Sequence, residues 1–572
     1  MSSPQSALSV EPGPSPLRRF WYRSLDRYPH TGPRVFYLAI VVMTTVLVYY
    51  ELFAPGAVSP TIISHYGMTF RYYVYATGVI SAMVGAFSSI IAGFADRFGR
   101  ANMVTYGVGA SVPLVLFGLP NAPNAISWVV LFCGIGFLEG FILVATPALV
   151  RDFSPQFGRS SAMAFWLLGP VIGSEVVTQV SSHTLSHLHP WQDQFTICGV
   201  VGLVVFLIAL FGLRELSPNL RDQLMVSMRD RVLVEAKAKG IDVRSTTRKP
   251  WRQMIRFDIA GPAFGAGTLL FMYSTFVGFL VIFLATTFGY SEQRANALGN
   301  WFWAFNAVGL ILSGLLSDRL KVRKPFMVFG AMGAMVMSIV WALRTMNPAT
   351  SYYTFVIIVS LLGFFLSSAY APWFASLTET IEARNPALTA TGLAVAGWVN
   401  KITIALMALI LPFVVVAMTP IVNFAAQSAP TAAKYASEIS TSKAMDAATS
   451  RALTANPADP VAGAKAVAEI SAKFHTSSAS ALQRLIALGK ATQQKDFRSF
   501  LSRAAAVAPS VKHNARDWQH WWWVCLGGQV LFLPFIFMMV GRWRPRNAKR
   551  DAEEHDRTIE EELAKLSLRR AG

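Results

Sequence analysis

Four ionisable side chains lie inside long apolar stretches of this 572-residue sequence, where a charge is costly. They are Glu51, Glu139, Glu175 and Lys401. A charged side chain costs a few kcal/mol or more to place in a membrane, so each should face a polar cavity or a partner. A buried carboxylate can take up and release a proton, and a buried lysine can pair with an acid or bind a carboxylate on a solute. These residues predict a pathway for solutes or protons.

Uncharged polar and aromatic residues at similar depth are further candidates for contact with a solute. They are Tyr50, Tyr273, Trp303, Asn306 and Asn400. Each could stack on a solute or hydrogen-bond to it, and helix packing is the alternative role for each.

Motifs of covalent or nucleotide chemistry are not found in the sequence. There is no phosphate-binding glycine loop and no convincing hydrolytic triad, so we expect neither an enzyme nor ATP-driven transport, and no cofactor. His183, His187 and His189 crowd one loop, but their spacing matches no strong metal site, and a solvated loop is the favoured interpretation.

The composition favours an all-α integral membrane protein. Apolar residues make up 53% of the chain and charged residues only 14%, too few to cover a water-soluble surface. A helix needs about 20 apolar residues to cross the bilayer. Twelve such stretches are predicted, at 35–62, 71–94, 102–120, 125–149, 160–181, 195–213, 259–286, 295–316, 325–344, 352–377, 389–418 and 520–541.

The stretches and the segments between them predict two halves and one insertion. The segments are a disordered cytoplasmic tail (1–34), a six-helix bundle (35–213), a cytoplasmic connector (214–257), helices seven to eleven (258–418), an extracytoplasmic insertion (419–518), helix twelve (519–541) and a cytoplasmic tail (542–572). The insertion is rich in Ala and Ser and predicts three to five short helices, which form a cap that could bind a partner. Trp518 and Trp521 to Trp523 follow it and are expected to form an interfacial belt.

The net charge of +19 indicates orientation rather than nucleic-acid binding. With a cytoplasmic N-terminus, the inner loops hold twenty Lys and Arg, and the short outer loops hold only three, Arg71, Arg294 and Arg344. Inner loops of membrane proteins carry this excess, so both termini are predicted on the cytoplasmic side of a bacterial plasma membrane. Anionic lipids are the expected partners of the basic face, with Arg18, Arg19 and Arg23 as an anchor.

A charged signature occurs twice, six stretches apart. It reads GFADRFGR after the second stretch and GLLSDRLKVRK after the eighth. An Asp at a helix end followed by Arg residues can form charge-assisted bonds to the neighbouring bundle, making a latch that breaks when the inside opens. The gate residues expected from it are Gly93, Asp96, Arg97, Gly99, Arg100, Gly314, Asp318 and Arg319.

This repeated signature resembles motif A of the major facilitator superfamily, G-x-x-x-D-R-x-G-R-[RK]. The first copy has Ala92 where the motif has its first Gly, and the second has Lys321 where it has its later Gly. The resemblance implies two pseudo-symmetric six-helix bundles that hold a solute near mid-membrane and expose it to each side in turn.

Two further resemblances bear on the type of transport. Tyr50-Glu51-Leu52 is similar to the Tyr-Asp-Leu of proton symporters in this superfamily, so proton-coupled symport of a small organic solute, with Glu51 and Glu139 carrying protons or substrate charge, is the leading hypothesis. Gly169 to Gly173 resembles part of a drug-antiporter motif, which keeps efflux as an alternative. An envelope scaffold or receptor that uses the insertion is the alternative of another class.

Overall fold

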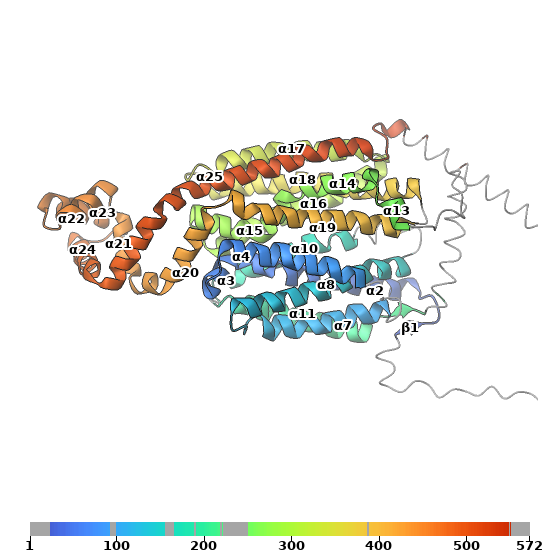
Figure 1. Ribbon diagram of the computed structural model, residues 1–572, viewed down its shortest axis with the longest axis horizontal. Helices are drawn as coiled ribbons and strands as arrows, with labels where there is room; N and C mark the ends of the chain where they lie inside the picture. The colour runs from blue at the N-terminus through green and yellow to red at the C-terminus, as the bar shows by residue number, and fades with distance from the viewer. Residues whose placement is uncertain are drawn as a thin grey trace, which may run out of the picture.

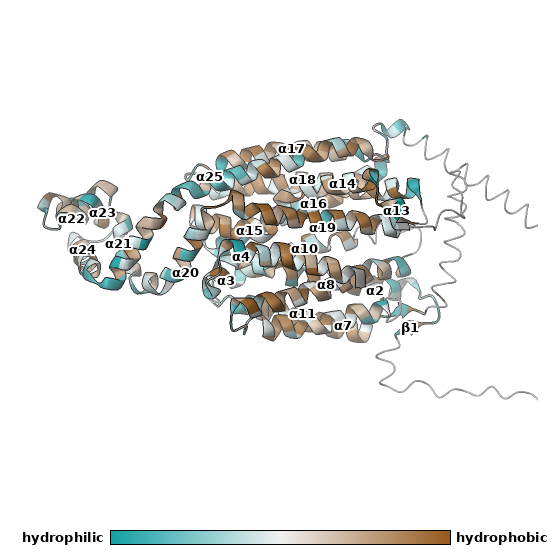
Figure 2. Cartoon of the chain, viewed as in Figure 1, coloured by the Kyte–Doolittle hydropathy of each residue, from teal (hydrophilic) through white to brown (hydrophobic). Residues whose placement is uncertain are grey.

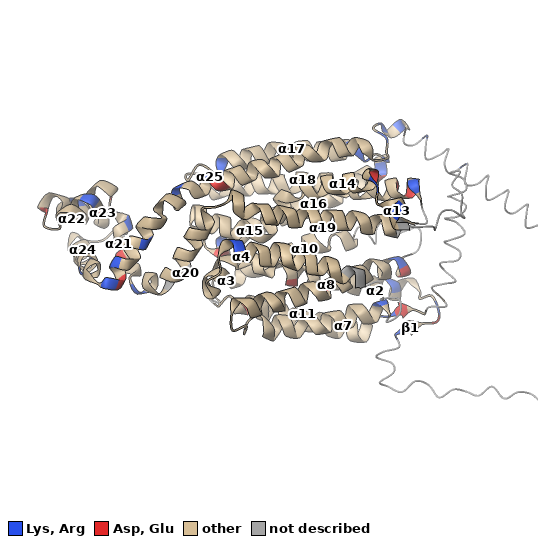
Figure 3. Cartoon of the chain, viewed as in Figure 1, with Lys and Arg blue, Asp and Glu red and all other residues tan. Residues whose placement is uncertain are grey.

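The computed structural model describes residues 23–91, 99–154, 165–187, 190–217, 220, 250–385, 388–547, 550 and 557. These residues are nearly all helical, apart from a two-residue parallel pairing of β1 (Ser24–Leu25) with β2 (Glu215–Leu216). The helices form a bundle with hydrophobic flanks, and charged residues gather toward its ends (Figures 1, 2 and 3). This distribution is that of a protein whose long sides face lipid.

The first half of the bundle follows the apolar stretches before the connector. Its elements are α2 (Thr31–Ala57), α3 (Ser59–Tyr66), α4 (Phe70–Val74), η1 (Tyr75–Ile80), α5 (Ser81–Ile91), α7 (Arg100–Pro113), η3 (Leu114–Gly118), α8 (Ala125–Phe153), α10 (Gly169–Thr184) and α11 (Gln192–Gly212). The Asn124 side chain starts α8 by accepting a hydrogen bond from Ser127 N at 2.9 Å.

The second half has the same kind of helices and continues into the insertion. Its elements are α13 (Pro250–Met254), α14 (Phe257–Leu269), α15 (Phe271–Phe288), α16 (Glu292–Leu320), α17 (Lys324–Arg344), α18 (Tyr352–Arg384), α19 (Thr389–Val414) and α25 (Lys495–Met538). Ser291 and Ser351 cap α16 and α18 in the way that Asn124 caps α8.

The all-helical membrane fold is confirmed. Ten helices in the described part of the chain are long and apolar enough to cross a membrane. Two expected crossings are not among these ten helices. The crossing expected at 71–94 coincides with three shorter helices in succession, α4, η1 and α5. The crossing expected at 160–181 coincides with α10, which has only 16 residues. The count of twelve stays a prediction at these two places, as do the segment boundaries.

Residues 23–34, which belong to the predicted tail, include regular structure. Residues 24–34 contain β1 and the first turn of α2, and most of the connector lies outside the described residues. Arg23 is only 1% exposed and donates to Thr105 Oγ1 at 3.0 Å and to Ala209 O at 2.9 Å. The prediction of a lipid anchor is therefore wrong for Arg23, because the pairing of β1 with β2 draws it into the first half. Arg18 and Arg19 lie outside the described residues.

The tryptophan cluster is a buried core rather than an interfacial belt. Trp518, Trp521 and Trp522 are fully buried, and only Trp523 is exposed, at 37%. Trp522 lies with its ring centre 5.1 Å from that of Phe283, and Trp521 Nε1 donates to Thr275 Oγ1 at 3.0 Å. The reason is that α25 packs on α14, α15 and α17, so consecutive residues point in different directions.

The insertion forms five helices beyond one end of the bundle (Figure 1). They are α20 (Met418–Lys434), α21 (Ala436–Ala444), α22 (Ala447–Ala455), α23 (Pro460–Phe474) and α24 (Ser478–Gln493). We call these five helices the cap. Its base, α20, packs on α25 of the second half and also on α3 and α4 of the first half. The cap therefore connects the two halves at this end.

One polar cluster ties the two ends of the cap together, and it predicts an acid-sensitive cap. Lys434 Nζ donates to Asp496 Oδ2 at 2.7 Å, and the Tyr435 hydroxyl donates to Asp496 Oδ1 at 2.9 Å. The hydrogen bond from Lys434 lowers the pKa of Asp496. A carboxyl with a lowered pKa contributes stability that is complete above its unfolded pKa of about 4 and is lost as the pH falls through the folded value.

We expect hydrogen exchange in residues 435–497 to be unchanged from pH 8 to 5, after correction for the intrinsic rate, and to rise below about pH 4. Asp496→Asn should raise exchange already at neutral pH and remove the additional rise in acid. Glu438→Gln, at a carboxylate that makes no ion pair among the described residues, is the control. An acid response that persists in Asp496→Asn would contradict this assignment.

Candidate functional site

Glu139 and Lys401 approach each other from opposite halves of the bundle. Glu139 lies midway along α8, and Lys401 lies midway along α19. The two charges interact electrostatically without forming a direct ion pair. Glu139 is only 3% exposed, and its Oε1 has no hydrogen-bond partner among the described residues. A buried carboxylate in this condition is open to a proton, a water molecule or a solute.

A group of tyrosines from three helices adjoins Glu139. Tyr49 on α2 lies within electrostatic range of Glu139 and of Tyr370 on α18, and Tyr273 on α15 lies within range of both tyrosines. The Tyr273 hydroxyl and Asn400 Oδ1 are buried, and neither finds a hydrogen-bond partner in the described ranges. We call Tyr49, Glu139, Tyr273, Tyr370, Asn400 and Lys401 the central cluster. Tyr49 and Tyr370 were not among the residues predicted from the sequence, whereas Tyr273 was.

A cavity lies between the two halves, next to Tyr273 of the central cluster. Trp303 packs against Tyr273, with ring centres 5.0 Å apart, and forms part of the cavity wall. The cavity has an empty volume of about 330 Å³, and its other walls come from α2, α10, α15 and α16. The lining is mostly apolar, with polar atoms from Ser174, Thr178 and Asn296.

Besides Trp303, four of the predicted site residues are not members of the central cluster. Glu51 Oε1 accepts a hydrogen bond from Ser111 Oγ on α7 at 3.2 Å, and its Oε2 has no partner among the described residues. The Glu51 carboxylate also interacts electrostatically with that of Glu139. Glu175 Oε1 accepts from Gln179 on its own helix at 2.7 Å. Asn306 Nδ2 donates to Gly363 O at 3.2 Å and so joins α16 to α18. Tyr50 is 3% exposed, and its hydroxyl has no partner in the described part of the chain.

The two halves meet at the capped end of the bundle. The contacts that join them there include Thr61 N to Glu292 Oε1 at 3.0 Å, Asn296 Nδ2 to Ala57 O at 2.9 Å, Asn300 Nδ2 to Ser182 Oγ at 3.0 Å, and the rings of Phe70 and Phe279 at 6.0 Å. Gly56 permits the closest approach, because a Cβ there would lie 2.2 Å from Val277 O. The structure therefore describes a state in which the capped side is closed.

The first latch joins α7 to α8 at the other end. Gly93, Asp96 and Arg97 lie outside the described residues. Arg100 Nη1 donates to Asp152 Oδ1 and Oδ2 at 2.8 and 2.7 Å, and Arg100 N donates to Glu215 Oε2 at 2.6 Å. Gly99 has φ +89°, and a Cβ on it would lie 2.3 Å from Glu215 Oε1, so glycine is needed there.

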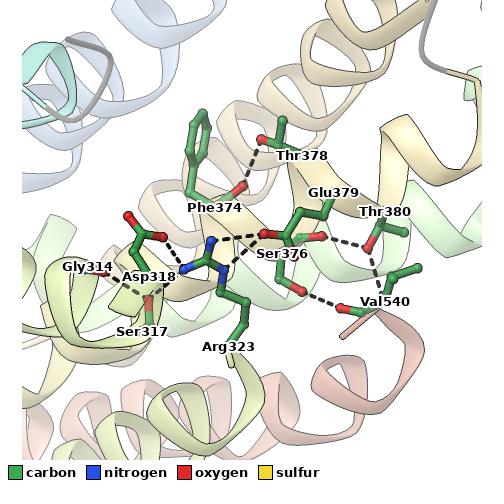
Figure 4. A network of polar contacts seen from close by, with 10 residues as sticks. All are labelled: Gly314, Ser317, Asp318, Arg323, Phe374, Ser376, Thr378, Glu379, Thr380 and Val540. Atoms are coloured by element: carbon green, nitrogen blue, oxygen red, sulfur yellow. Dashed lines mark hydrogen bonds and ion pairs between the residues drawn. The ribbon is translucent and has the colours of Figure 1, made fainter. Parts of the chain in front are cut away.

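The second latch uses Arg323 instead of the predicted Arg319 (Figure 4). Arg323 binds Asp318 and donates to Glu379 Oε1 at 3.1 Å from Nε and 3.0 Å from Nη2. Burial opposes its charge, but the Glu379 and Asp318 carboxylates raise the pKa of the guanidinium. Arg319 is exposed and makes no ion pair with any described residue, and a Cβ at Gly314 would meet nothing within 4 Å.

The two latches are equivalent in the two halves. In each, an Arg at the start of one helix binds a carboxylate near the end of the next crossing, Asp152 in α8 and Glu379 in α18. Both bonds stay within one half, whereas bonds to the neighbouring bundle were predicted from the sequence. Asp152 and Glu379 were missed, although similar separations of 52 and 56 residues from their arginines repeat in the two halves.

Replacing Arg323 with Gln is expected to lower the stability of the second half. The change removes the cation that separates Asp318 from Glu379, and since both carboxylates are partly exposed, we expect a loss of about 1 kcal/mol. Arg319→Gln should remain within about 0.5 kcal/mol of the wild type. Thermal unfolding in detergent measures both, and equal melting temperatures for the two variants would contradict the observed pairing.

Comparison with known proteins agrees with this architecture. The family model described as Major Facilitator Superfamily matches residues 41–412. The gallate transporter of Pseudomonas putida is 20% identical over 364 residues, which are 60% of this chain and 78% of that protein. The 4-hydroxybenzoate transporter of Pseudomonas aeruginosa is 24% identical, over 48% of this chain and 64% of that protein. The efflux pump radE of Floropilus chiversii is 25% identical, over 48% and 54%.

Solved structures show the same fold. A bacterial homologue of the human lysosomal transporter Spinster, in an inward-facing and occupied conformation, has a TM-score of 0.55 and 15% identity, and covers 89% of this chain and 97% of its own. The D-xylose-proton symporter has a TM-score of 0.51 and 14% identity, over 66% and 90%. The relatives are transporters rather than enzymes, and the helices indicate a multi-pass membrane protein. The chain belongs to the major facilitator superfamily of membrane transporters.

Proposed function

We propose that this chain is a proton-coupled symporter that brings a small organic solute across the plasma membrane by alternating access. The observation that carries this proposal is the central cluster, in which Glu139 and Lys401 interact between the halves beside buried polar atoms that lack partners. An acid and a base held between two moving bundles can bind a proton and a solute in the same cycle.

The cluster supports a simple coupling scheme for an anionic solute. While the site is empty, Lys401 compensates the charge of Glu139. When a solute carboxylate binds Lys401, Glu139 loses that compensation and takes up a proton, since an unpaired buried carboxylate is costly. Solute and proton then cross together without net charge. On the other side, loss of the proton restores the interaction of Glu139 with Lys401 and releases the solute.

The proposed solute class is a small aromatic carboxylate. Lys401 would bind the carboxylate, while the rings of Tyr273 and Trp303 could pack on the aromatic part. Two of the relatives are named for gallate and 4-hydroxybenzoate, which are of this class. Further support is that the Tyr273 hydroxyl and Asn400 Oδ1 have no hydrogen-bond partner among the described residues and could bind hydroxyl groups on the solute ring.

We further propose that the cap is extracytoplasmic, with both termini in the cytoplasm, because the basic loops lie at the opposite end. The latches at Arg100 and Arg323 then belong to the cytoplasmic gate. The cap belongs to the outer gate, because α20 connects the two halves there and has to move when they separate.

Transport into sealed vesicles tests the proposal. Purified protein is reconstituted, and uptake of radiolabelled 4-hydroxybenzoate is followed with the outside more acidic than the inside. Symport predicts accumulation above equilibrium that a protonophore abolishes. Uptake that only equilibrates, whatever the pH gradient, would exclude proton coupling.

Proton-driven efflux is the second candidate. It is supported by the relative named as an efflux pump and by the segment from Gly169 to Gly173 in α10. The same vesicles separate the two, because an antiporter accumulates the solute only when the inside is the more acidic side.

A further inference from the structure

We propose that the outer end of α25, together with the adjoining end of α17, forms a binding site for the headgroup of an anionic phospholipid in the extracytoplasmic leaflet. The site consists of Arg344, Lys512, Arg516 and His520, above Trp523. It uses the orientation given under the proposed function, but it requires no particular solute or coupling ion.

The residues on α25 share one exposed face that runs from the cap into the membrane. Lys512, Arg516 and His520 are four residues apart, so they lie above one another on the helix, and all three are exposed. Trp523 follows Arg516 by seven residues, or two turns, and Val530 and Phe537 continue the same face at 50% and 65% exposure. The face therefore changes from basic to aromatic to apolar along its length.

This order matches the layers of a bilayer. Exposed apolar residues such as Val530 and Phe537 face the acyl chains, and a tryptophan prefers the boundary with the headgroups. Arg516 lies about 10 Å above Trp523 along the helix, and the headgroup layer on each side is about 5–8 Å thick. The guanidinium of Arg516 and the ring of His520 can therefore reach the depth of the lipid phosphates.

The end of α17 adds a further cation beside this face. Gln519 Nε2 donates to Ala342 O at 3.1 Å, which places the last turn of α17 against α25 at this level. Arg344 ends that turn and is exposed. Two helices thus bring three permanent cations to one seam at the membrane surface.

These cations differ from the other two outer-loop arginines in having no partner. The Arg71 guanidinium lies 4.9 Å from the ring centre of Phe413, and that of Arg294 lies 4.6 Å from that of Tyr290. Arg344, Lys512, Arg516 and His520 make neither an ion pair nor a cation–π contact among the described residues. The nearby acid, Asp517, accepts a hydrogen bond from Ala417 N at 2.9 Å and so serves the base of the cap. Charge complementarity therefore favours an anionic ligand, and the apolar face below favours one with acyl chains.

Lipid binding by the full-length protein tests this site. Protein in detergent is titrated with phosphatidylglycerol, phosphatidylcholine or inorganic phosphate, and thermal stability and bound lipid, by native mass spectrometry, are recorded. The test variant is Arg344→Gln/Lys512→Gln/Arg516→Gln. The control is Arg451→Gln/Lys473→Gln/Lys490→Gln, which removes the same charge from exposed positions in the cap.

Phosphatidylglycerol should stabilise the wild type and the control, and its apparent affinity for the test variant should fall roughly 100-fold, about fivefold for each cation lost near a membrane surface. High salt should reduce the affinity for the wild type as well. Equal affinity of the test and control variants for phosphatidylglycerol would overturn the proposal. So would stabilisation of the wild type by phosphatidylcholine or by inorganic phosphate that equals its stabilisation by phosphatidylglycerol. Equal melting temperatures of the two variants without lipid show that the test variant is folded. None of these measurements depends on transport.

Discussion

Glu139→Gln is expected to abolish accumulation of the solute against its gradient while leaving exchange of solute across the membrane. Glutamine occupies nearly the same volume but cannot carry a proton, so solute movement is no longer coupled to the pH gradient. Each pH unit corresponds to a factor of ten in proton activity, so a gradient of about two units can sustain up to ~100-fold accumulation by one-to-one symport. The variant should reach a ratio of about one. Uptake into reconstituted vesicles, with and without the pH gradient, measures this ratio.

Glu175→Gln is the matched control for this experiment, because Glu175 is also an acid within a membrane helix but is bound by Gln179 on the same helix. It should keep accumulation within about twofold of the wild type, as expected for a site outside the pathway.

Glu51→Gln distinguishes between two possible proton carriers, Glu51 and Glu139. Glu51 contacts Ser111 inside the first half and is not part of the central cluster. If Glu51→Gln loses accumulation and Glu139→Gln keeps it, the proton is carried by Glu51, and our assignment to Glu139 is wrong.

Gly56→Ala is expected to prevent the halves from closing at the capped end. The added Cβ would lie 2.2 Å from Val277 O, a backbone atom that cannot move by a change of rotamer. Overpacking of this kind costs about 1–3 kcal/mol, which would shift the population from closed to open at this side by roughly 5- to 150-fold. Transport should fall, because the cycle requires this closure. The measurement uses Thr178→Cys, a cysteine placed in the cavity wall. A membrane-impermeant maleimide added from the capped side should label this cysteine faster when Gly56→Ala is also present than when Gly56 is kept.

Gly278→Ala is the matched control, since this glycine lies beside Val277 but a Cβ on it would meet nothing within 4 Å. Its labelling rate and transport should equal those of the wild type. Equal labelling rates in Gly56→Ala and Gly278→Ala would show that the contact of α2 with α15 does not limit opening.

A charge in an apolar helix is a stronger signal in the sequence than an uncharged polar side chain. Glu139 and Lys401 stood out because a charge in an apolar helix is costly, and the structure brings them together. Tyr49 and Tyr370 have no such signal, and the place of Tyr49 near Glu139 and of Tyr370 near Tyr49 depends on the rotation of α2 and α18. The same rotation turns Glu51 toward Ser111, although it precedes Leu52 in the segment that resembles proton symporters.

The latches show a similar limit. The repeated Asp-Arg signature predicted two charged turns, of which the first lies mostly outside the described residues, and it assigned the second bond to Arg319. The helix α16 ends at Leu320, and Lys321 adopts a left-handed conformation at φ 54°, which redirects the chain and brings Arg323 onto Asp318. A pattern in sequence specifies which charges are near in the chain, whereas the turn between the helices decides which of them meet.

The sequence by itself determined that the chain is a helical membrane protein with a duplicated charged turn and a polar insertion, because hydrophobicity and charge act residue by residue. Only the tertiary structure decided which faces of the helices meet. It buried three of the four tryptophans of α25, seated Arg23 in the first half, and brought Lys401 within electrostatic range of Glu139. Of the four ionisable residues in the membrane helices, Glu139 and Lys401 thus interact across the two halves, and a partner across this interface depends on helix rotation and on contacts between distant parts of the chain.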